Sequence, residues 1–120
     1  LVDRMLEGGS KFVISDADLD VYRRPFLKSS DSGRSLLMTL RNLNLPSAMT
    51  EIETGLPQWK QPMLIVWGVK DPWLNIEPAQ TLANQSNTIE LVKLEDAAHY
   101  PQEHWPNDIS ESLLTFLRRQ

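Results

Sequence analysis

Cysteine is absent from the 120-residue sequence. Its absence excludes disulfide bonds, iron–sulfur clusters, thiolate zinc sites and a cysteine nucleophile. An excess of basic residues is missing too, because 12 lysines and arginines stand against 16 acidic residues and the formal net charge is −4. A chain of this balance has no electrostatic footprint for nucleic acid, so we expect no nucleic-acid partner.

Long apolar runs are also missing, since no stretch approaches the roughly 20 residues that a membrane-spanning helix needs. The chain does not open with a charged and then apolar leader that ends in small residues. We therefore expect a soluble, cytoplasmic protein with no membrane partner. The rest of the composition, 41% hydrophobic and 23% charged, is typical of folded proteins, and the length fits one domain of ordinary size.

The first half of the chain has helical patterns. Ser15 followed by Asp18 is typical of a helix start, and we expect Pro25 to end that short helix, which covers residues 16–24. A third helix is expected over residues 48–54. Between these two, leucines at helical spacing predict another helix: Leu36, Leu37, Leu40 and Leu43.

The second half alternates between strand and helix patterns. The apolar run at residues 63–67 predicts a strand buried on both faces, and residues 88–94 predict a second strand. A helix from Glu77 separates them, and another begins at Pro106. Strand, helix, strand, helix is the unit of a parallel sheet, so the fold class is α/β. Two strands are too few to be stable alone, so we expect the end of a larger sheet.

Two titratable residues follow the two expected strands. Asp71 comes after the first strand and His99 after the second. Parallel neighbours put their carboxyl ends on the same edge, where open α/β sheets bind ligands. A carboxylate beside an imidazole would form the acid–base half of a catalytic triad. The alternatives are an aspartate that only forms a turn and a histidine that is only hydrogen-bonded in the surface or core.

Other candidates are weaker. His99 and His104 are five positions apart, which does not match the spacing of metal ligands, so we expect no metal and no cofactor. Aromatic residues cluster around the two loops and could line an apolar pocket. Among them, Trp67 and Trp105 are better explained as packing residues, which leaves Trp73 and Tyr100.

Four segments resemble the α/β-hydrolases. Residues 62–73 resemble the penultimate strand and acid loop of these enzymes, residues 96–103 their histidine loop, and residues 106–119 their last helix. The order of acid before histidine also matches the family. The string Tyr22-Arg23-Arg24-Pro25-Phe26-Leu27 is similar to the cap helices of the haloalkane dehalogenase and epoxide hydrolase branch.

The resemblance implies a C-terminal portion of an α/β-hydrolase fold, with residues 1–57 as a helical cap segment and residues 58–120 as part of the core. It implies that Asp71 is the triad acid and His99 the general base. The substrate pocket is expected to include three aromatic residues: Phe26, Trp73 and Tyr100. The complete enzyme would hydrolyse a small apolar substrate, which could be a haloalkane, an epoxide or an ester, with a serine or aspartate nucleophile.

The sequence departs from the family pattern in two places. Ala98 stands where a glycine usually precedes the histidine. No G-x-S-x-G or equivalent aspartate turn is present, because Gly8-Gly9-Ser10 lacks the next glycine and an apolar strand before it. We therefore expect this chain, which begins with Leu1, to be inactive alone and to need the N-terminal half of the same protein.

Two further alternatives remain. The chain could be a non-catalytic binding or assembly module derived from a hydrolase fold, which would cover its open sheet edge by self-association. It could also belong to a pseudoenzyme that lacks the nucleophile altogether.

Overall fold

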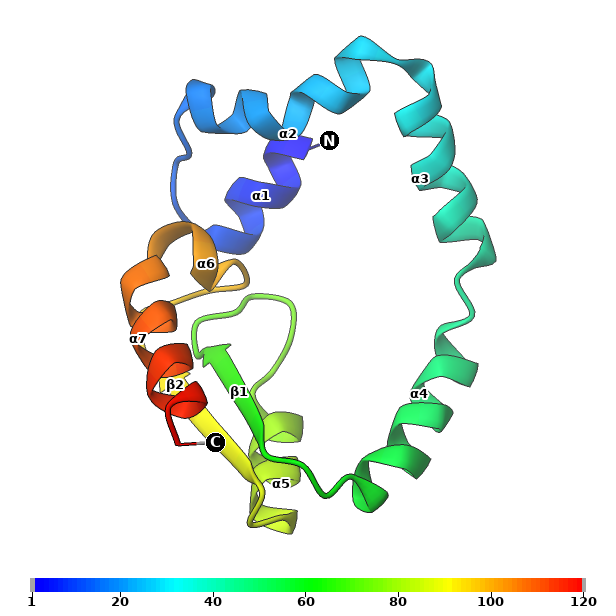
Figure 1. Ribbon diagram of the computed structural model, residues 1–120. Coiled ribbons are helices and arrows are strands. Elements are labelled where there is room, and N and C mark those ends of the chain that lie inside the picture. Colours follow the sequence, from blue (N-terminus) through cyan, green and yellow to red (C-terminus); the bar gives the residue numbers. More distant parts are fainter. Residues whose placement is uncertain (1, 120) are drawn as a thin grey trace. The chain divides into compact units, whose positions relative to one another are not determined.

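The computed structural model describes residues 2–119, which form two compact units. The first, called the α/β unit below, contains residues 3–13 and 60–119. The second, called the helical unit, contains residues 14–59. A helical segment is thus followed by strand, helix, strand and helix, as predicted (Figure 1). The role of residues 1–57 as a cap segment stays a prediction.

The helical unit contains three helices and a short 3₁₀ turn: α2 (Asp16–Lys28), α3 (Ser30–Asn42), α4 (Leu45–Gly55) and η1 (Leu56–Gln58). Ser15 caps α2 as expected, since its hydroxyl accepts the Asp18 N–H at 3.2 Å. The prediction that Pro25 ends this helix is wrong. Helix α2 continues to Lys28, and the chain leaves it at Ser29, which has extended backbone and caps α3. The stop signal is therefore the N-cap of the next helix.

Helix α4 begins three residues before the predicted start. Asn44 caps it by accepting the Ser47 N–H, and Pro46 occupies its first turn, where a missing N–H costs nothing.

Many large apolar side chains of the helical unit are exposed: Val21, Leu27, Leu37, Met38, Leu40, Leu43, Leu45, Met49 and Ile52.

The α/β unit opens with a helix that the sequence patterns did not predict, α1 (Val2–Ser10). It ends at Lys11, whose φ of 60° lies in the left-handed region usual for a glycine after a helix. The apolar residues 12–14 form no strand.

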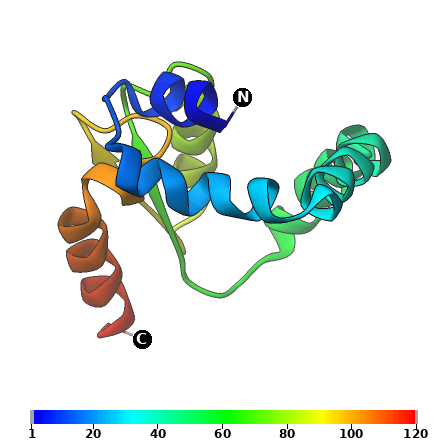
Figure 2. The ribbon, with the colours of Figure 1, turned by 90° about the horizontal axis from the view of Figure 1, so that it is seen from above.

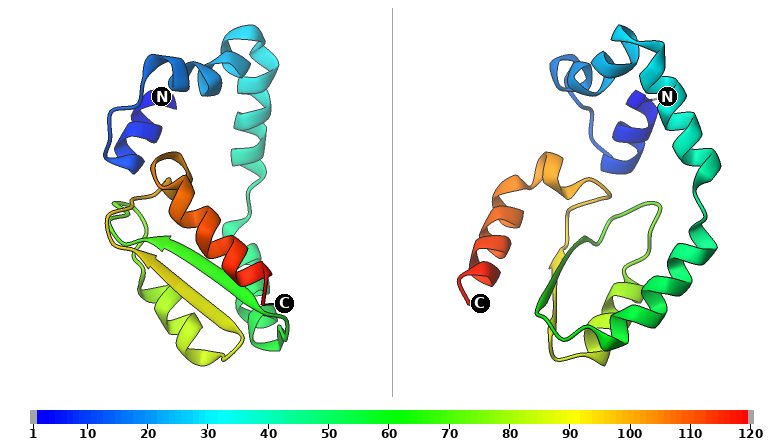
Figure 3. Two further views of the ribbon diagram at one scale, coloured as in Figure 1. Left: turned by 60° about the vertical axis from the view of Figure 1, so that its left-hand side comes forward. Right: turned by 45° about the vertical axis from the view of Figure 1, so that its right-hand side comes forward.

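The centre of the α/β unit is a parallel pair of strands, β1 (Met63–Gly68) and β2 (Ile89–Leu94). They pair in register from Met63 opposite Ile89 to Gly68 opposite Leu94. Helix α5 (Glu77–Gln85) packs on β2 and α7 (Pro106–Leu117) on β1, and the two helices cover opposite sides of the strands (Figure 3). A four-residue helix, α6 (Pro101–His104), lies between β2 and α7.

The strands are less buried than their composition predicts. Residues 63–67 of β1 are all apolar, yet each is only half-buried, and β2 is similar. In residues 2–119, β1 pairs with β2 on one side and has no strand on the other. No helix in this part of the chain has the length and apolar character needed to cross a membrane.

Candidate active site

The loops that follow β1 and β2 are joined by backbone hydrogen bonds. The N–H of Val69 donates to Leu94 O at 3.0 Å, and the N–H of Lys70 donates to Ala97 O at 2.8 Å. Gly68 lies against the second loop so closely that a Cβ would sit 2.7 Å from Ala97 O and nearer still to Ala98 O. Only glycine fits this contact, so the backbone itself brings the two loops together.

The paired loops place Asp71 and His99 in direct contact. His99 Nδ1 lies 2.7 Å from Asp71 Oδ2, and the aspartate side chain is only 7% exposed. An ionised carboxylate can only accept, so Nδ1 carries the hydrogen and Nε2 is the nitrogen with a free lone pair. The imidazole is 25% exposed, so Nε2 can act as a base on a molecule at this edge.

Hydrogen bonds to the other oxygen of Asp71 fix the orientation of its carboxylate. Asp71 Oδ1 accepts the backbone N–H of Trp73 at 2.8 Å and that of Leu74 at 3.0 Å. Burial acts to raise the pKa of Asp71, but these hydrogen bonds, the bond from His99 and the attraction between the carboxylate and that ring when it is protonated outweigh it, so the pKa lies below its ordinary value of 3.8. Asp71 is therefore ionised at neutral pH.

Two of the three predicted pocket residues contact the imidazole. The ring of Trp73 meets the His99 ring edge-on at a centroid distance of 4.7 Å, and that of Tyr100 does so at 4.8 Å. Phe26 lies on α2 in the helical unit and is 40% exposed. The role of all three in binding substrate stays a prediction.

Helix α1 contributes a contact that sequence reasoning missed. The backbone N–H of His99 donates to Gly9 O at 3.0 Å. The two adjacent glycines at the end of this helix are the one sequence signal that could have indicated a close approach. An ion pair between Lys70 and Asp96 also links the two loops, two residues after the end of each strand.

The second histidine belongs to a different cluster. The His104 ring lies 4.8 Å from that of Phe12 and 5.7 Å from that of Trp105. Trp105 also packs on Phe12, at 5.3 Å, in agreement with its expected packing role. In the described part of the chain, no three histidine, aspartate or glutamate side chains converge as metal ligands.

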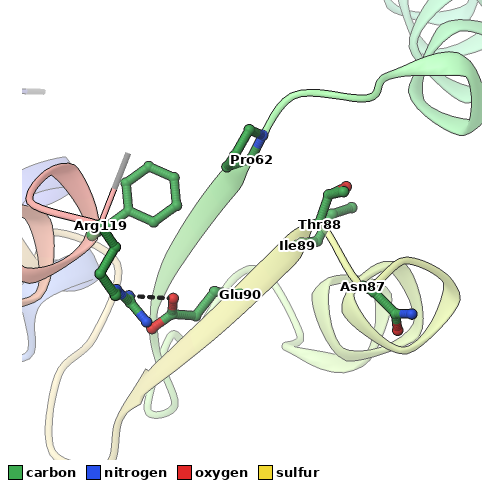
Figure 4. Close-up of a pocket in the computed structure, with 7 residues that line it drawn as sticks. Pro62, Asn87, Thr88, Ile89, Glu90 and Arg119 are labelled. Carbon is green, nitrogen blue, oxygen red and sulfur yellow. Dashed lines mark hydrogen bonds and ion pairs between the residues drawn. The ribbon is translucent and has the colours of Figure 1, made fainter.

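A hollow of about 190 Å³ lies at the other end of the strands (Figure 4). Its lining comes from residues before or at the start of the strands and from the end of the chain: Pro62, Asn87, Thr88, Ile89, Glu90, Phe116 and Arg119. Arg119 Nη2 lies 2.6 Å from Glu90 Oε2 on its wall. This hollow lies at the amino edge of the sheet, whereas open α/β sheets bind ligands at the carboxyl edge. We therefore assign the candidate site to the carboxyl edge, where Asp71 and His99 meet.

The imidazole has one side-chain hydrogen-bond partner in the described part of the chain. Within residues 2–119, Asp71 is the one side chain that hydrogen-bonds the His99 ring. The pair can hold and move a proton, and no serine or second aspartate among these residues is bonded to the ring.

The geometry can be compared with known proteins. No protein-family model matches the chain. The chain is 26% identical to a protein named epoxide hydrolase 1, from Caenorhabditis elegans, over 106 residues. The match includes 88% of this chain and 25% of that protein, so the chain spans about a quarter of the relative's length. The match is therefore a distant, partial likeness to a protein named as an epoxide hydrolase.

Proposed function

We propose that the chain forms the acid–histidine half of an α/β-hydrolase active site, with His99 as general base and Asp71 as the acid that orients it. The observation that carries this proposal is the 2.7 Å contact between His99 Nδ1 and Asp71 Oδ2. These side chains come from the carboxyl ends of adjacent parallel strands, where this fold class places its catalytic groups.

The proposed chemistry is a proton transfer at His99 Nε2. In a hydrolase with an aspartate nucleophile, the imidazole takes a proton from water, and the oxygen attacks the ester of the covalent intermediate. In one with a serine nucleophile, the imidazole takes the serine proton directly. In both cases Asp71, ionised and bonded to Nδ1, stabilises the imidazolium that forms.

The nucleophile is proposed to come from a part of the protein outside residues 1–120. The unpaired edge of β1 and the half-buried apolar residues of both strands support this, because a parallel pair needs neighbouring strands. The helical unit is proposed to be a cap segment. The relative is named an epoxide hydrolase, so an epoxide is the first substrate class to test, followed by a haloalkane and an ester.

The test begins with the coding sequence upstream of Leu1. We expect it to encode a strand that ends in a serine or aspartate nucleophile, and the longer protein to hydrolyse styrene oxide, 1-bromobutane or p-nitrophenyl acetate. His99→Ala should lower kcat at least about 100-fold, while Lys28→Ala on α2 should not change it. Turnover by the 120-residue chain alone, or turnover that persists in His99→Ala, would contradict the proposal.

A second candidate is favoured by the open edge of β1. An unpaired parallel strand with apolar, half-exposed side chains can bind another chain, so the protein could be a non-catalytic assembly module that self-associates there. Sedimentation of the 120-residue chain separates the two. A folded, defined dimer together with no upstream nucleophile would support the module, and aggregation would support the incomplete hydrolase.

A further inference from the structure

The C-terminal end of α1 lies against the loop that carries His99. The carbonyl oxygen of Gly9 accepts the backbone N–H of His99 at 3.0 Å, and Gly9 is buried. Figures 1 and 2 show this end of α1 beside the loops that follow the strands. His99 is thus hydrogen-bonded at two places: its backbone N–H bonds to Gly9 and its ring bonds to Asp71.

Gly9 leaves no space for a side chain. A Cβ at this position would lie 2.6 Å from Tyr100 Cε2, 2.8 Å from Trp73 Cζ3 and 2.9 Å from Trp73 Cη2. These distances are shorter than real contacts of a Cβ, so the two rings would have to move. Among residues 2–119 no glycine has a positive φ. Glycine weakens a helix relative to alanine, and the backbone at residue 9 does not require it. The glycine is therefore explained by the lack of space for a side chain.

The rings that occupy this space are those that contact the imidazole. Trp73 and Tyr100 meet the His99 ring at 4.7 and 4.8 Å, and they lie 6.1 Å from each other. Any shift forced on them by a side chain at residue 9 would be passed to the imidazole. The carbonyl of Gly9 would shift at the same time, because it belongs to the same residue.

We infer that Gly9 is a positioning residue for His99, which it holds through its carbonyl and through the space it leaves for Trp73 and Tyr100. The inference rests on the proposed function of His99 as general base. Gly9 touches no reacting atom and acts only through the orientation of the imidazole. A displacement of about 1 Å of a catalytic group can lower a rate about 100-fold, so this contact is expected to affect turnover.

Gly8 provides the matched control. It is the neighbouring residue on α1, and a Cβ there would lie 3.7 Å from Trp73 Cζ2, which is an ordinary contact. Gly8→Ala and Gly9→Ala add the same methyl group to the same helix, and both raise its helix propensity. The difference between the two variants therefore reports the space at Gly9 alone.

The experiment is ring and backbone NMR of the longer protein that contains this chain, with kcat measured on the same samples. In Gly9→Ala, we expect the low-field Nδ1–H signal of His99 to shift or broaden and its amide exchange to accelerate at least about tenfold. In the longer protein, kcat should fall about 100-fold, while KM should change less and only through the displaced rings of Trp73 and Tyr100. Gly8→Ala should change none of these. An unchanged Nδ1–H signal in Gly9→Ala would overturn the inference.

A compensating variant covers the case in which Gly9→Ala does not fold. Tyr100→Leu removes one ring and gives Trp73 room to move, so Gly9→Ala/Tyr100→Leu should fold and recover the Nδ1–H signal. A double variant that stays unfolded, or folds without the signal, would overturn the inference. The proposed function is tested separately from this inference. If the wild-type longer protein shows no turnover, the proposed function is wrong, but the NMR comparison of Gly9→Ala and Gly8→Ala still tests whether Gly9 positions His99.

Discussion

Gly68 lies directly against the carbonyl oxygen of Ala98, with no room between them for a Cβ. This contact joins the end of β1 to the loop after β2, three residues before Asp71 and one residue before His99. The carboxylate and the imidazole meet because the backbones that carry them pack without intervening side chains. The acid–histidine geometry therefore depends on a residue that has no side chain.

Gly68→Ala is expected to destabilise the α/β unit. The added methyl group would overlap two backbone carbonyls that cannot rotate away, and overpacking of this kind costs about 1–3 kcal/mol. Urea unfolding followed by circular dichroism measures the change. Gly33→Ala is the control, because a Cβ there meets nothing within 4 Å and a glycine inside a helix should gain roughly 0.5–1 kcal/mol on replacement. Equal effects of the two substitutions would contradict this explanation.

The stability of the chain is expected to depend on the ionisation of Asp71 in acid. Its pKa in the folded chain lies below the ordinary value of 3.8, so the unfolded chain binds a proton first as the pH falls. The contribution of Asp71 to stability is therefore complete above about pH 4 and is lost as the pH falls through the folded value. Urea unfolding from pH 6 to pH 3 should show a steeper loss in the wild type than in Asp71→Asn. Parallel curves would mean that the carboxylate is not stabilised as described.

Lys11→Gly is expected to stabilise the chain. Lys11 has a φ of 60°, which disfavours a side chain and suits glycine, and it ends α1 by donating its N–H to Glu7 O at 2.9 Å. Part of the gain is offset by the extra freedom of glycine when unfolded, so the net change should be about 0.5–1 kcal/mol. Lys28→Gly, in the last turn of α2, should instead be destabilising by about 1 kcal/mol. Thermal unfolding of both variants tests the sign, and a destabilised Lys11→Gly would contradict the prediction.

The two strands and the helices α5 and α7 could be predicted from the sequence because their signals are local. The apolar run of β1 lies between a proline and a glycine, Pro78 marks the first turn of α5, and each element appears where its pattern begins. The meeting of Asp71 and His99 could also be predicted, because parallel neighbours place their carboxyl ends on one edge.

Other features depended on tertiary contacts that no local pattern contains. The sequence patterns do not predict helix α1 because Gly8 and Gly9 weaken its helical pattern, and Gly9 is explained only by rings from residues far along the chain. The end of α2 was placed at Pro25, although Ser29 is the actual stop because it caps the next helix. The bond from His99 to Gly9 links positions 90 residues apart, and the adjacent glycines 8 and 9 are its one sequence signal.

The central claim is that Asp71 and His99 share a hydrogen bond from adjacent strand ends. Proton–nitrogen NMR of the histidine rings tests it most directly, and the chain contains only two histidines. His104 is an internal control, since its Nε2 is buried with no hydrogen-bond partner in the described residues. We expect a low-field Nδ1–H signal from His99 that moves upfield in Asp71→Asn, while the His104 signals stay unchanged. A His99 ring without that signal, or one that ignores the substitution, would contradict the account.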